Sequence, residues 1–494
     1  MTQHSDSVSA RPKDAILDIQ GTITKAPLSR KMIIMPIVVA ILLIIGHFLP
    51  LDSYGENTGI GLCFFISAVL CHIVQPWDMV ITAIMVPVGG YLLGIWDWSL
   101  FQTVSGTSTF VSMFAMTLLA AGAQTTPIGK RIALLFLRQL GSSPVRLTVA
   151  FGAITAIISA FVSNTATLIM MSTIANSMLI TMNEKPGQSK LGRTLMTLIA
   201  TASFIGGMAL ISGAPQGNML GITLLENATD GQFTVTYSQW AAVGVPATLI
   251  ILVPMGLLFA YGNNLSKNDS TVMVSKDYYD DLLKEMGPVG GSEIRWIVTT
   301  LAMVIALTCG THGTVTPLIA AIVTMLPVIG TVPMRDVFKL VPMKVLFIMF
   351  FVTIIGKLFS VTGLGAFFTA ILAPMVSGMS PLVLSITLMA IQVFLVNACP
   401  NSATGIFSMI MGIGTPLCIA SGYNPSVVLL PVMMSSCFFF VLRLNTTIIL
   451  NKDYGWWELK DSVVPSLILS ILLIILMPVL AHLICPMVGM NIYL

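Results

Sequence analysis

Long apolar stretches, separated by short polar segments, run through almost the whole chain from residue 32 onward. A helix needs about 20 mainly apolar residues to cross the hydrocarbon core of a bilayer. The pattern therefore predicts an all-α polytopic membrane protein with about eleven transmembrane helices. Two further apolar stretches, 147–182 and 382–418, are predicted to form re-entrant helical hairpins. The predicted spans are 32–50, 59–75, 79–95, 105–127, 194–224, 238–261, 295–311, 314–331, 345–370, 425–450 and 463–486.

Lysine and arginine residues predict the topology, because short cytoplasmic loops carry an excess of them. They are absent from 32–129 and from 358–442, and they cluster elsewhere. Their positions place the tail 1–31 and the polar linker 262–294 in the cytoplasm, and the C-terminus outside. The first hairpin has cationic clusters at both ends, so we expect it to enter from the cytoplasm. The second lies in a segment without cations and is expected to enter from outside.

The composition excludes a water-soluble protein. Apolar residues make up 56% of the 494 residues and charged residues 9%, whereas soluble proteins carry about 25% charged residues. The net charge of +3 does not suggest a surface for nucleic acid. Seven cysteines are scattered without a C-x-x-C pair, so neither a zinc site nor a disulfide framework is indicated.

Two parts of the chain match at a constant offset, which indicates an internal repeat. Because the two hairpins are predicted to enter from opposite sides, the repeat would be inverted, as in many secondary transporters. The alternative is two unrelated hairpins that share a few small residues. Ser143-Pro144 and Ser380-Pro381, Asn164 and Asn401, and Ala166-Thr167 and Ala403-Thr404 are each 237 residues apart. The expected order is tail 1–31, scaffold helices 32–104, first repeat 105–261, linker 262–294, scaffold helices 295–344 and second repeat 345–494.

Each hairpin has a polar tip rich in hydroxyl and amide side chains. The tips are 163–167, with the sequence SNTAT, and 400–404, with the sequence PNSAT. Unsatisfied backbone groups are costly in hydrocarbon, so such tips are expected to line a wet cavity, where they can donate hydrogen bonds to a carboxylate. Such residues also join membrane helices merely as hydrogen bonders. A third break is predicted at 212–218, with 444–447 as its counterpart in the second repeat.

With these motifs the sequence resembles the divalent anion/sodium symporter family, which includes di- and tricarboxylate carriers. The family implies a homodimer whose protomers contain a scaffold domain and a transport domain that moves as an elevator. It also implies carboxylate contacts from the two tips and from the second broken helix. Those contacts would come from Asn164, Thr165, Asn401, Ser402 and Thr446.

The resemblance also implies two sodium sites. The first would be formed by Ser159, Ser163, Asn164 and Gly213, all of which are present. The second departs from the family pattern, because Val396 replaces a hydroxyl, Pro400 replaces the motif serine, and Asn445 stands where a small residue is expected. Sodium is the only cofactor that the sequence suggests.

Two cations in predicted spans suggest what replaces the second sodium. Arg443 precedes the second break and Lys357 lies in the span 345–370. A cation inside a span is costly and by default marks a functional site. A fixed positive charge would favour movement of the loaded carrier alone, which predicts exchange of one dicarboxylate for another. The alternatives are that Arg443 reaches the interface and that Lys357 forms a structural ion pair.

The sequence thus predicts a secondary transporter of C4 or C5 dicarboxylates, such as succinate, malate or 2-oxoglutarate, with citrate also compatible. Exchange is favoured, and sodium-coupled symport is the alternative. An anion channel and a membrane-embedded enzyme are less favoured, because the closed tips do not resemble a pore and no nucleophile–base pair is evident. No P-loop suggests an ATP-driven pump. A bacterial inner membrane is the expected location.

Overall fold

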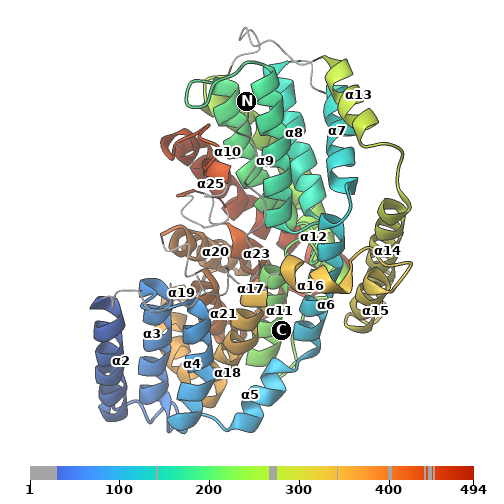
Figure 1. Ribbon diagram of the computed structural model, residues 1–494. Coiled ribbons are helices and arrows are strands. Elements are labelled where there is room, and N and C mark those ends of the chain that lie inside the picture. Colours follow the sequence, from blue (N-terminus) through green and yellow to red (C-terminus); the bar gives the residue numbers. More distant parts are fainter. Residues whose placement is uncertain are drawn as a thin grey trace, which may run out of the picture.

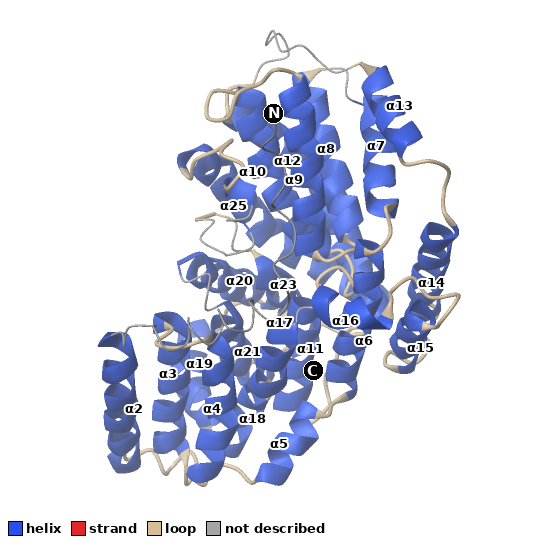
Figure 2. Cartoon of the chain, viewed as in Figure 1, coloured by secondary structure: helices blue, strands red, loops and turns tan. Residues whose placement is uncertain are grey.

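The computed structural model describes residues 30–140, 143–265, 275–341, 343–398, 403–438, 441, 442, 448 and 451–494. Every named element in these ranges is helical, as Figure 2 shows. One isolated antiparallel bridge joins Tyr423 to Tyr493 near the C-terminus. The predicted all-α fold is therefore confirmed.

The helices follow one another with short connections (Figure 1). Those before the linker are α2 (Arg30–Phe48), α3 (Thr58–Val74), α4 (Met79–Leu92), α5 (Trp98–Ser105), α6 (Ser108–Gln124), α7 (Ile128–Leu140), α8 (Pro144–Ser159), α9 (Asn164–Thr181), α10 (Lys190–Gly207), α11 (Pro215–Ala228) and α12 (Tyr237–Gly262). Those from the linker onward are α13 (Lys276–Glu285), α14 (Gly291–Thr308), α15 (Val315–Met325), α16 (Met334–Leu340), α17 (Met343–Val352), α18 (Ile354–Val361), α19 (Leu364–Val376), α20 (Pro381–Ala398), α21 (Ala403–Ala420), α22 (Pro425–Val428), α23 (Leu430–Met434), η2 (Ser435–Cys437), α25 (Lys460–Ile484) and η3 (Cys485–Val488).

Several helices begin where the sequence supplies a cap for the first free backbone N–H groups. Asp78 caps α4 and accepts a hydrogen bond from the N–H of Val80 at 2.9 Å. Thr236 and Gln239 form a capping box at the start of α12, in which each side chain accepts from the backbone N–H of the other. Proline in the first turn fixes the starts of α8 and α11.

Six described helices are long and apolar enough to cross a bilayer, and two bent pairs raise that number to eight. Several shorter apolar helices coincide with other predicted spans. The predicted span 194–224 is interrupted, because α10 ends at Gly207 and α11 begins at Pro215. The predicted hairpin 147–182 contains α8 and α9, and the predicted hairpin 382–418 contains α20 and α21, with residues 399–402 between them outside the described part of the chain.

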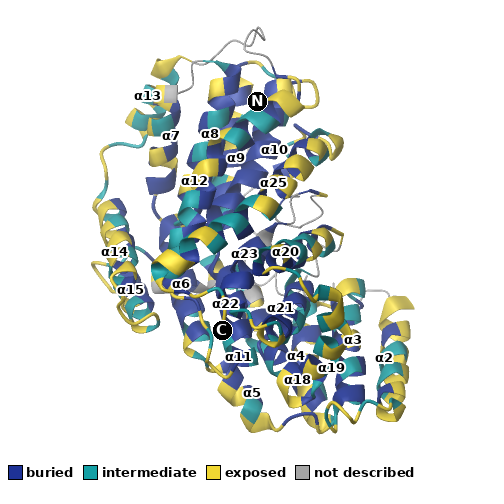
Figure 3. Ribbon diagram, turned by 180° about the vertical axis from the view of Figure 1, so that it is seen from behind, coloured by how far each residue is buried: buried dark blue, intermediate teal, exposed yellow. Residues whose placement is uncertain are grey.

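The helices are held by two hydrophobic cores. The smaller core contains residues of α3, α4, α5, α17, α18 and α19, and includes Phe65 and Phe359, whose ring centroids are 5.1 Å apart. The larger core contains residues of α6 to α17 and of α20 to α25, so α17 contributes to both cores. Figure 3 shows exposed residues along α2, where Ile33, Ile37 and Ile44 are each more than half exposed. Exposed apolar side chains along a helix are expected to contact lipid.

The described part of the polar linker 262–294 packs against the helix α7. It contains α13, whose Tyr279 is buried and whose Asp280 pairs with Arg138 of α7 at 2.9 Å. Arg131 of α7 is also buried and pairs with Glu293 at the start of α14 at 2.9 Å. Two ion pairs thus fix α7, which precedes the first hairpin, against α13 and the start of α14.

Candidate functional site

The tip of the first hairpin is a short break between two helices. α8 ends at Ser159 and α9 begins at Asn164. Ser163 caps α9, because its Oγ accepts a hydrogen bond from the N–H of Ala166 at 3.4 Å. The break therefore presents the partially positive N-terminus of α9 at the tip.

Ser159 and Asn164 contact each other inside this tip. The Oγ of Ser159 lies 2.9 Å from Oδ1 of Asn164 and 2.5 Å from the carbonyl oxygen of Ser203 on α10. A hydroxyl has one proton to donate. Both contacts are satisfied if Ser159 donates to Ser203 and accepts from the Asn164 amide group, which requires only a flip of that carboxamide. Both side chains are buried, so the pair ties the hairpin to α10.

Gly207 provides the space that Asn164 occupies. A Cβ atom added at Gly207 would lie 2.1 Å from Oδ1 of Asn164. Any larger residue at this position would therefore displace the carboxamide from the tip. The last turn of α10 and the first turn of α9 are shaped to fit each other.

Residues 208–214 interrupt the α10–α11 helix, and side chains satisfy the carbonyl groups that the break releases. Nδ2 of Asn218 donates to the carbonyl oxygen of Gly207 at 2.9 Å. Nε1 of Trp240 on α12 donates to the carbonyl oxygen of Met208 at 2.9 Å. Irregular backbone at membrane depth is tolerated where such partners or a wet cavity are available.

Three backbone carbonyl oxygens converge on Gly213 in this break. A Cβ atom added there would lie 2.8 Å from the carbonyl oxygen of Gly207, 2.9 Å from that of Ser159 and 3.0 Å from that of Ala160. Ser159 and Gly207 end their helices, where carbonyl groups lack intrahelical partners and the helix dipole is negative. Oxygen atoms with partial negative charge suit a hard cation such as Na⁺. The structure thus brings together Ser159, Asn164 and Gly213 of the predicted first sodium site.

The second hairpin has a different polar link to its own broken segment. Asn397 lies one residue before the end of α20 and is buried. Its Nδ2 donates to the carbonyl oxygen of Phe438 at 2.7 Å, and its Oδ1 accepts from the N–H of Val441 at 2.9 Å. The position equivalent to Ser159 holds the buried Val396. The polar side chain has therefore moved by one residue relative to the first hairpin.

The other predicted tip residues are placed as follows. Ser163 is half-buried and its Oγ caps α9. Among the described residues, no hydrogen bond joins it to Gly213. Thr165 is exposed, and its hydroxyl has no partner among the described residues, which leaves it available to a ligand. Asn401, Ser402, Arg443 and Thr446 lie outside the described residues.

Lys357 has a carboxylate partner of its own. Its ammonium group pairs with Asp230, in the connection between α11 and α12. The Lys357 side chain is 12% exposed and that of Asp230 is 79% exposed. This is the structural ion pair that the sequence analysis named as the alternative, and the countercharge role of Lys357 stays a prediction.

A further polar cluster joins the first hairpin to the segment 451–457. Nδ2 of Asn451 donates to Oγ of Ser172 on α9 at 2.5 Å, and Nε1 of Trp457 donates to Oδ1 of Asn451 at 2.7 Å. Nε1 of Trp456 donates to Asn176 on α9 at 2.8 Å. Sequence reasoning missed these residues, although two adjacent tryptophans in a polar segment are a signal of an anchored turn.

Comparison with known proteins identifies a family and several relatives of this chain. The family model described as "Citrate transporter" matches residues 37–434. A sodium-dependent dicarboxylate transporter from Staphylococcus saprophyticus is 25% identical over 361 residues, which are 67% of this chain and 67% of that protein. A Na⁺/citrate cotransporter from Rattus norvegicus is 25% identical over 238 residues, which are 38% of this chain and 41% of that protein.

Two solved structures have a similar fold. Neisseria gonorrhoeae MtrF, described as one of a class of antimetabolite efflux pumps, aligns with a TM-score of 0.54 over 92% of this chain and 95% of its own, at 13% identity. The Alcanivorax borkumensis YdaH transporter aligns with a TM-score of 0.52 over 93% of this chain and 99% of its own, at 15% identity. The matched family and the relatives above are transporters rather than enzymes.

Proposed function

Because the chain belongs to the citrate transporter family, we propose that it is a secondary transporter of C4 or C5 dicarboxylates, such as succinate, malate or 2-oxoglutarate, or of citrate. The observation that carries this proposal is the first hairpin tip, where the exposed Thr165 stands beside the buried Ser159–Asn164 contact. The names of two relatives, a sodium-dependent dicarboxylate transporter and a Na⁺/citrate cotransporter, support the same class of substrate.

Helix ends explain how one tip can serve an anion and a cation together. The N-terminus of α9 carries partial positive charge and presents the free hydroxyl of Thr165, which suits a carboxylate. The C-termini of α8 and α10 carry partial negative charge and converge on Gly213, which suits a cation. The anion and the cation would then lie on opposite sides of Asn164, so that each favours binding of the other.

We favour exchange of one dicarboxylate for another as the mode of transport. In the second hairpin, the amide group of Asn397 donates a hydrogen bond to the carbonyl of Phe438. At the corresponding place in the first half, carbonyl oxygens would bind a cation. A carboxamide in that place replaces the interactions of a second cation without binding one. Arg443, which lies outside the described residues, would add the fixed charge that resists movement of an empty site.

The second candidate is sodium-coupled symport. It is favoured by the carbonyl cluster around Gly213, which offers oxygen ligands to a sodium ion, and by the sodium dependence that the relatives' names state. Exchange and symport differ in whether uptake needs dicarboxylate on the far side of the membrane.

We further propose an elevator mechanism in a homodimer located in a bacterial inner membrane, with the N-terminus in the cytoplasm and the C-terminus outside. The two hydrophobic cores, which share only part of their helices, support two packing units that would move against each other. The scaffold would comprise the predicted scaffold helices 32–104 and 295–344, of which α3 to α5 lie in the smaller core. The two hairpins and their broken helices lie in the larger core and would contain the moving part.

Uptake of labelled succinate into proteoliposomes tests these proposals. The vesicles are either preloaded with unlabelled dicarboxylate or left empty, each with and without a sodium gradient. Uptake that requires preloading and ignores sodium supports exchange, and sodium-driven uptake into empty vesicles supports symport. Thr165→Val is expected to weaken succinate uptake in either case. Thr181→Val, which removes an exposed hydroxyl from the far end of α9, serves as the matched control. No uptake under any condition would refute dicarboxylate transport.

A further inference from the structure

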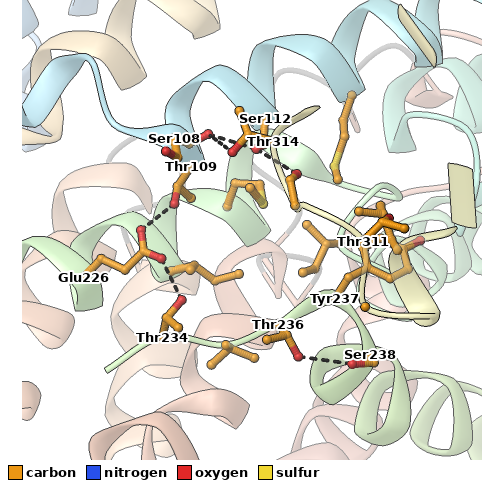
Figure 4. A pocket seen from close by; sticks show the side chains of 18 residues that line it. Ser108, Thr109, Ser112, Glu226, Thr234, Thr236, Tyr237, Ser238, Thr311 and Thr314 are labelled. Atoms are coloured by element: carbon orange, nitrogen blue, oxygen red, sulfur yellow. Dashed lines mark hydrogen bonds between the residues drawn. The ribbon is translucent and has the colours of Figure 1, made fainter. Parts of the chain in front are cut away.

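A cavity lies beside the broken segment between α10 and α11, where Ile211 lines it. It has a volume of about 290 Å³ and is bounded by the start of α6, the α11–α12 connection and the α14–α15 connection (Figure 4). Among the described residues that line it, every polar side chain except one is a hydroxyl. The exception is the carboxylate of Glu226, near the end of α11.

Glu226 is held by hydroxyl groups from two sides. Thr234 donates from Oγ1 to Oε1 of Glu226 at 2.6 Å, and Thr109 of α6 donates to Oε2. Figure 4 shows both contacts at one side of the cavity. A hydroxyl that donates its proton keeps its lone pairs. Four oxygen atoms, two from the carboxylate and two from threonines, are therefore adjacent and able to coordinate.

The charge of the lining selects the sign of the ligand. A single carboxylate surrounded by hydroxyls repels a dicarboxylate, and no Lys, Arg or His among the described lining residues would offset that repulsion. Hard cations prefer oxygen ligands of this kind. We propose that this cavity binds a sodium ion at Glu226, with Thr109 and Thr234 as further ligands.

The cavity is also connected to the broken helix that carries Gly213. Ile211, within the break, lines the cavity, and the next residue, Ser212, makes a hydrogen bond of 3.0 Å with the hydroxyl of Tyr237, which also lines it. In the topology that the charged residues predict, the three bounding segments face outside. The cavity is thus an outer site from which sodium reaches the carbonyl cluster at Gly213. This second role rests on the first cation site proposed above, whereas sodium binding at Glu226 does not.

Direct binding of ²²Na⁺ to the full-length protein, purified in nanodiscs without dicarboxylate, tests the inference. Glu226→Gln keeps the size of the side chain and removes its charge. We expect this variant to bind about one sodium fewer, or to bind it roughly tenfold more weakly. Asp97→Asn is the matched control, because Asp97 is exposed, lies outside the cavity and makes no capping hydrogen bond with its side chain. It is expected to bind sodium like the unmodified protein.

Thr109→Val provides a second variant that retains the carboxylate, and an intermediate loss of sodium affinity is expected. Asn164→Ala should remove a different sodium site and leave the one at Glu226 in place. Unchanged binding in Glu226→Gln, or an equal loss in Asp97→Asn, would overturn the inference. If the protein binds no ²²Na⁺ at all, the outer site is refuted, while uptake into preloaded vesicles would still establish dicarboxylate exchange.

Discussion

The two hairpins share an arrangement of helices and differ in what joins each hairpin to its broken helix. In the first, the hydroxyl of Ser159 reaches the carbonyl of Ser203, and carbonyl oxygens remain gathered around Gly213. In the second, the longer carboxamide of Asn397 takes both the carbonyl of Phe438 and the N–H of Val441. The short side chain of Ser159 leaves carbonyl oxygens around Gly213 available to an ion in the proposed site. The longer side chain of Asn397 makes hydrogen bonds with the backbone itself.

If the first break binds sodium as proposed, this difference explains how the second half would lack an ion site and keep the same helices. Breaking a helix releases carbonyl groups that need partners. A cation can supply them, and so can an amide group that donates hydrogen bonds. With a polar side chain at Asn397 instead of at position 396, an amide group takes the place of a cation as the partner of the carbonyl. If transport proves to depend on sodium, we therefore expect the dependence to arise mainly from the first half of the molecule.

The largest effect is expected from Asn164→Ala, which removes the centre of the first tip. Truncating one partner of a buried polar contact costs about 1–3 kcal/mol, which corresponds to roughly 5- to 150-fold in affinity. Succinate uptake should fall by that order, measured as initial rates in proteoliposomes. Asn176→Ala, on the same helix, removes an amide that accepts from Trp456 and should leave the succinate affinity unchanged. Equal loss in the two variants would contradict a binding role for Asn164.

Gly213→Ala tests the carbonyl cluster itself. The added methyl group would stand within 3.0 Å of three carbonyl oxygens, and overpacking of this kind typically costs about 1–3 kcal/mol. We expect sodium binding at the first site to weaken by about tenfold, as measured with ²²Na⁺. Gly290→Ala is the control, because a Cβ atom there meets its nearest neighbour at an ordinary 3.8 Å. Full sodium affinity in Gly213→Ala would mean that no ion binds among these carbonyls.

The double variant Val396→Ser with Asn397→Ala gives the second hairpin the Ser-Ala pair of the first, at 159 and 160. It replaces the carboxamide by a short hydroxyl and removes the hydrogen bond that Asn397 donates to the carbonyl of Phe438. We expect sodium to stimulate uptake by about two- to fivefold more than in the unmodified protein, an effect of under 1 kcal/mol. The variant Asn397→Ala alone controls for the loss of the carboxamide. If sodium does not stimulate uptake in either variant, the two halves do not differ in the way proposed.

The smallest effect is expected at the boundary between the two cores. Lys357 of α18 pairs with Asp230 beyond the end of α11. Because Asp230 is 79% exposed, screening by solvent limits the pair to roughly 0–1 kcal/mol. A double-mutant cycle with Lys357→Met and Asp230→Asn, read by thermal unfolding, should give a coupling energy in that range. Loss of exchange in Lys357→Met, but not in Asp230→Asn, would instead support a countercharge role for Lys357.

Local signals in the sequence predicted most of the described helices and the breaks between α8 and α9 and between α10 and α11. Apolar length and turn residues act over a few neighbours, so the stretches 147–182 and 382–418 were recognisable as paired helices around a polar tip. Ser159, Asn164 and Gly213 were identified through the resemblance to a transporter family. Their assembly into one cluster is visible only in the structure, because they come from three elements.

What the sequence by itself determined was the all-helical membrane fold, the breaks and the residue types available for an anion and a cation. Only the tertiary structure decided which groups meet. Asn397 donates a hydrogen bond to the carbonyl of Phe438, Lys357 pairs with Asp230, and Glu226 faces a cavity lined with hydroxyls. Each of these contacts joins residues distant in the chain. No local pattern encodes them, since they depend on how the helices pack.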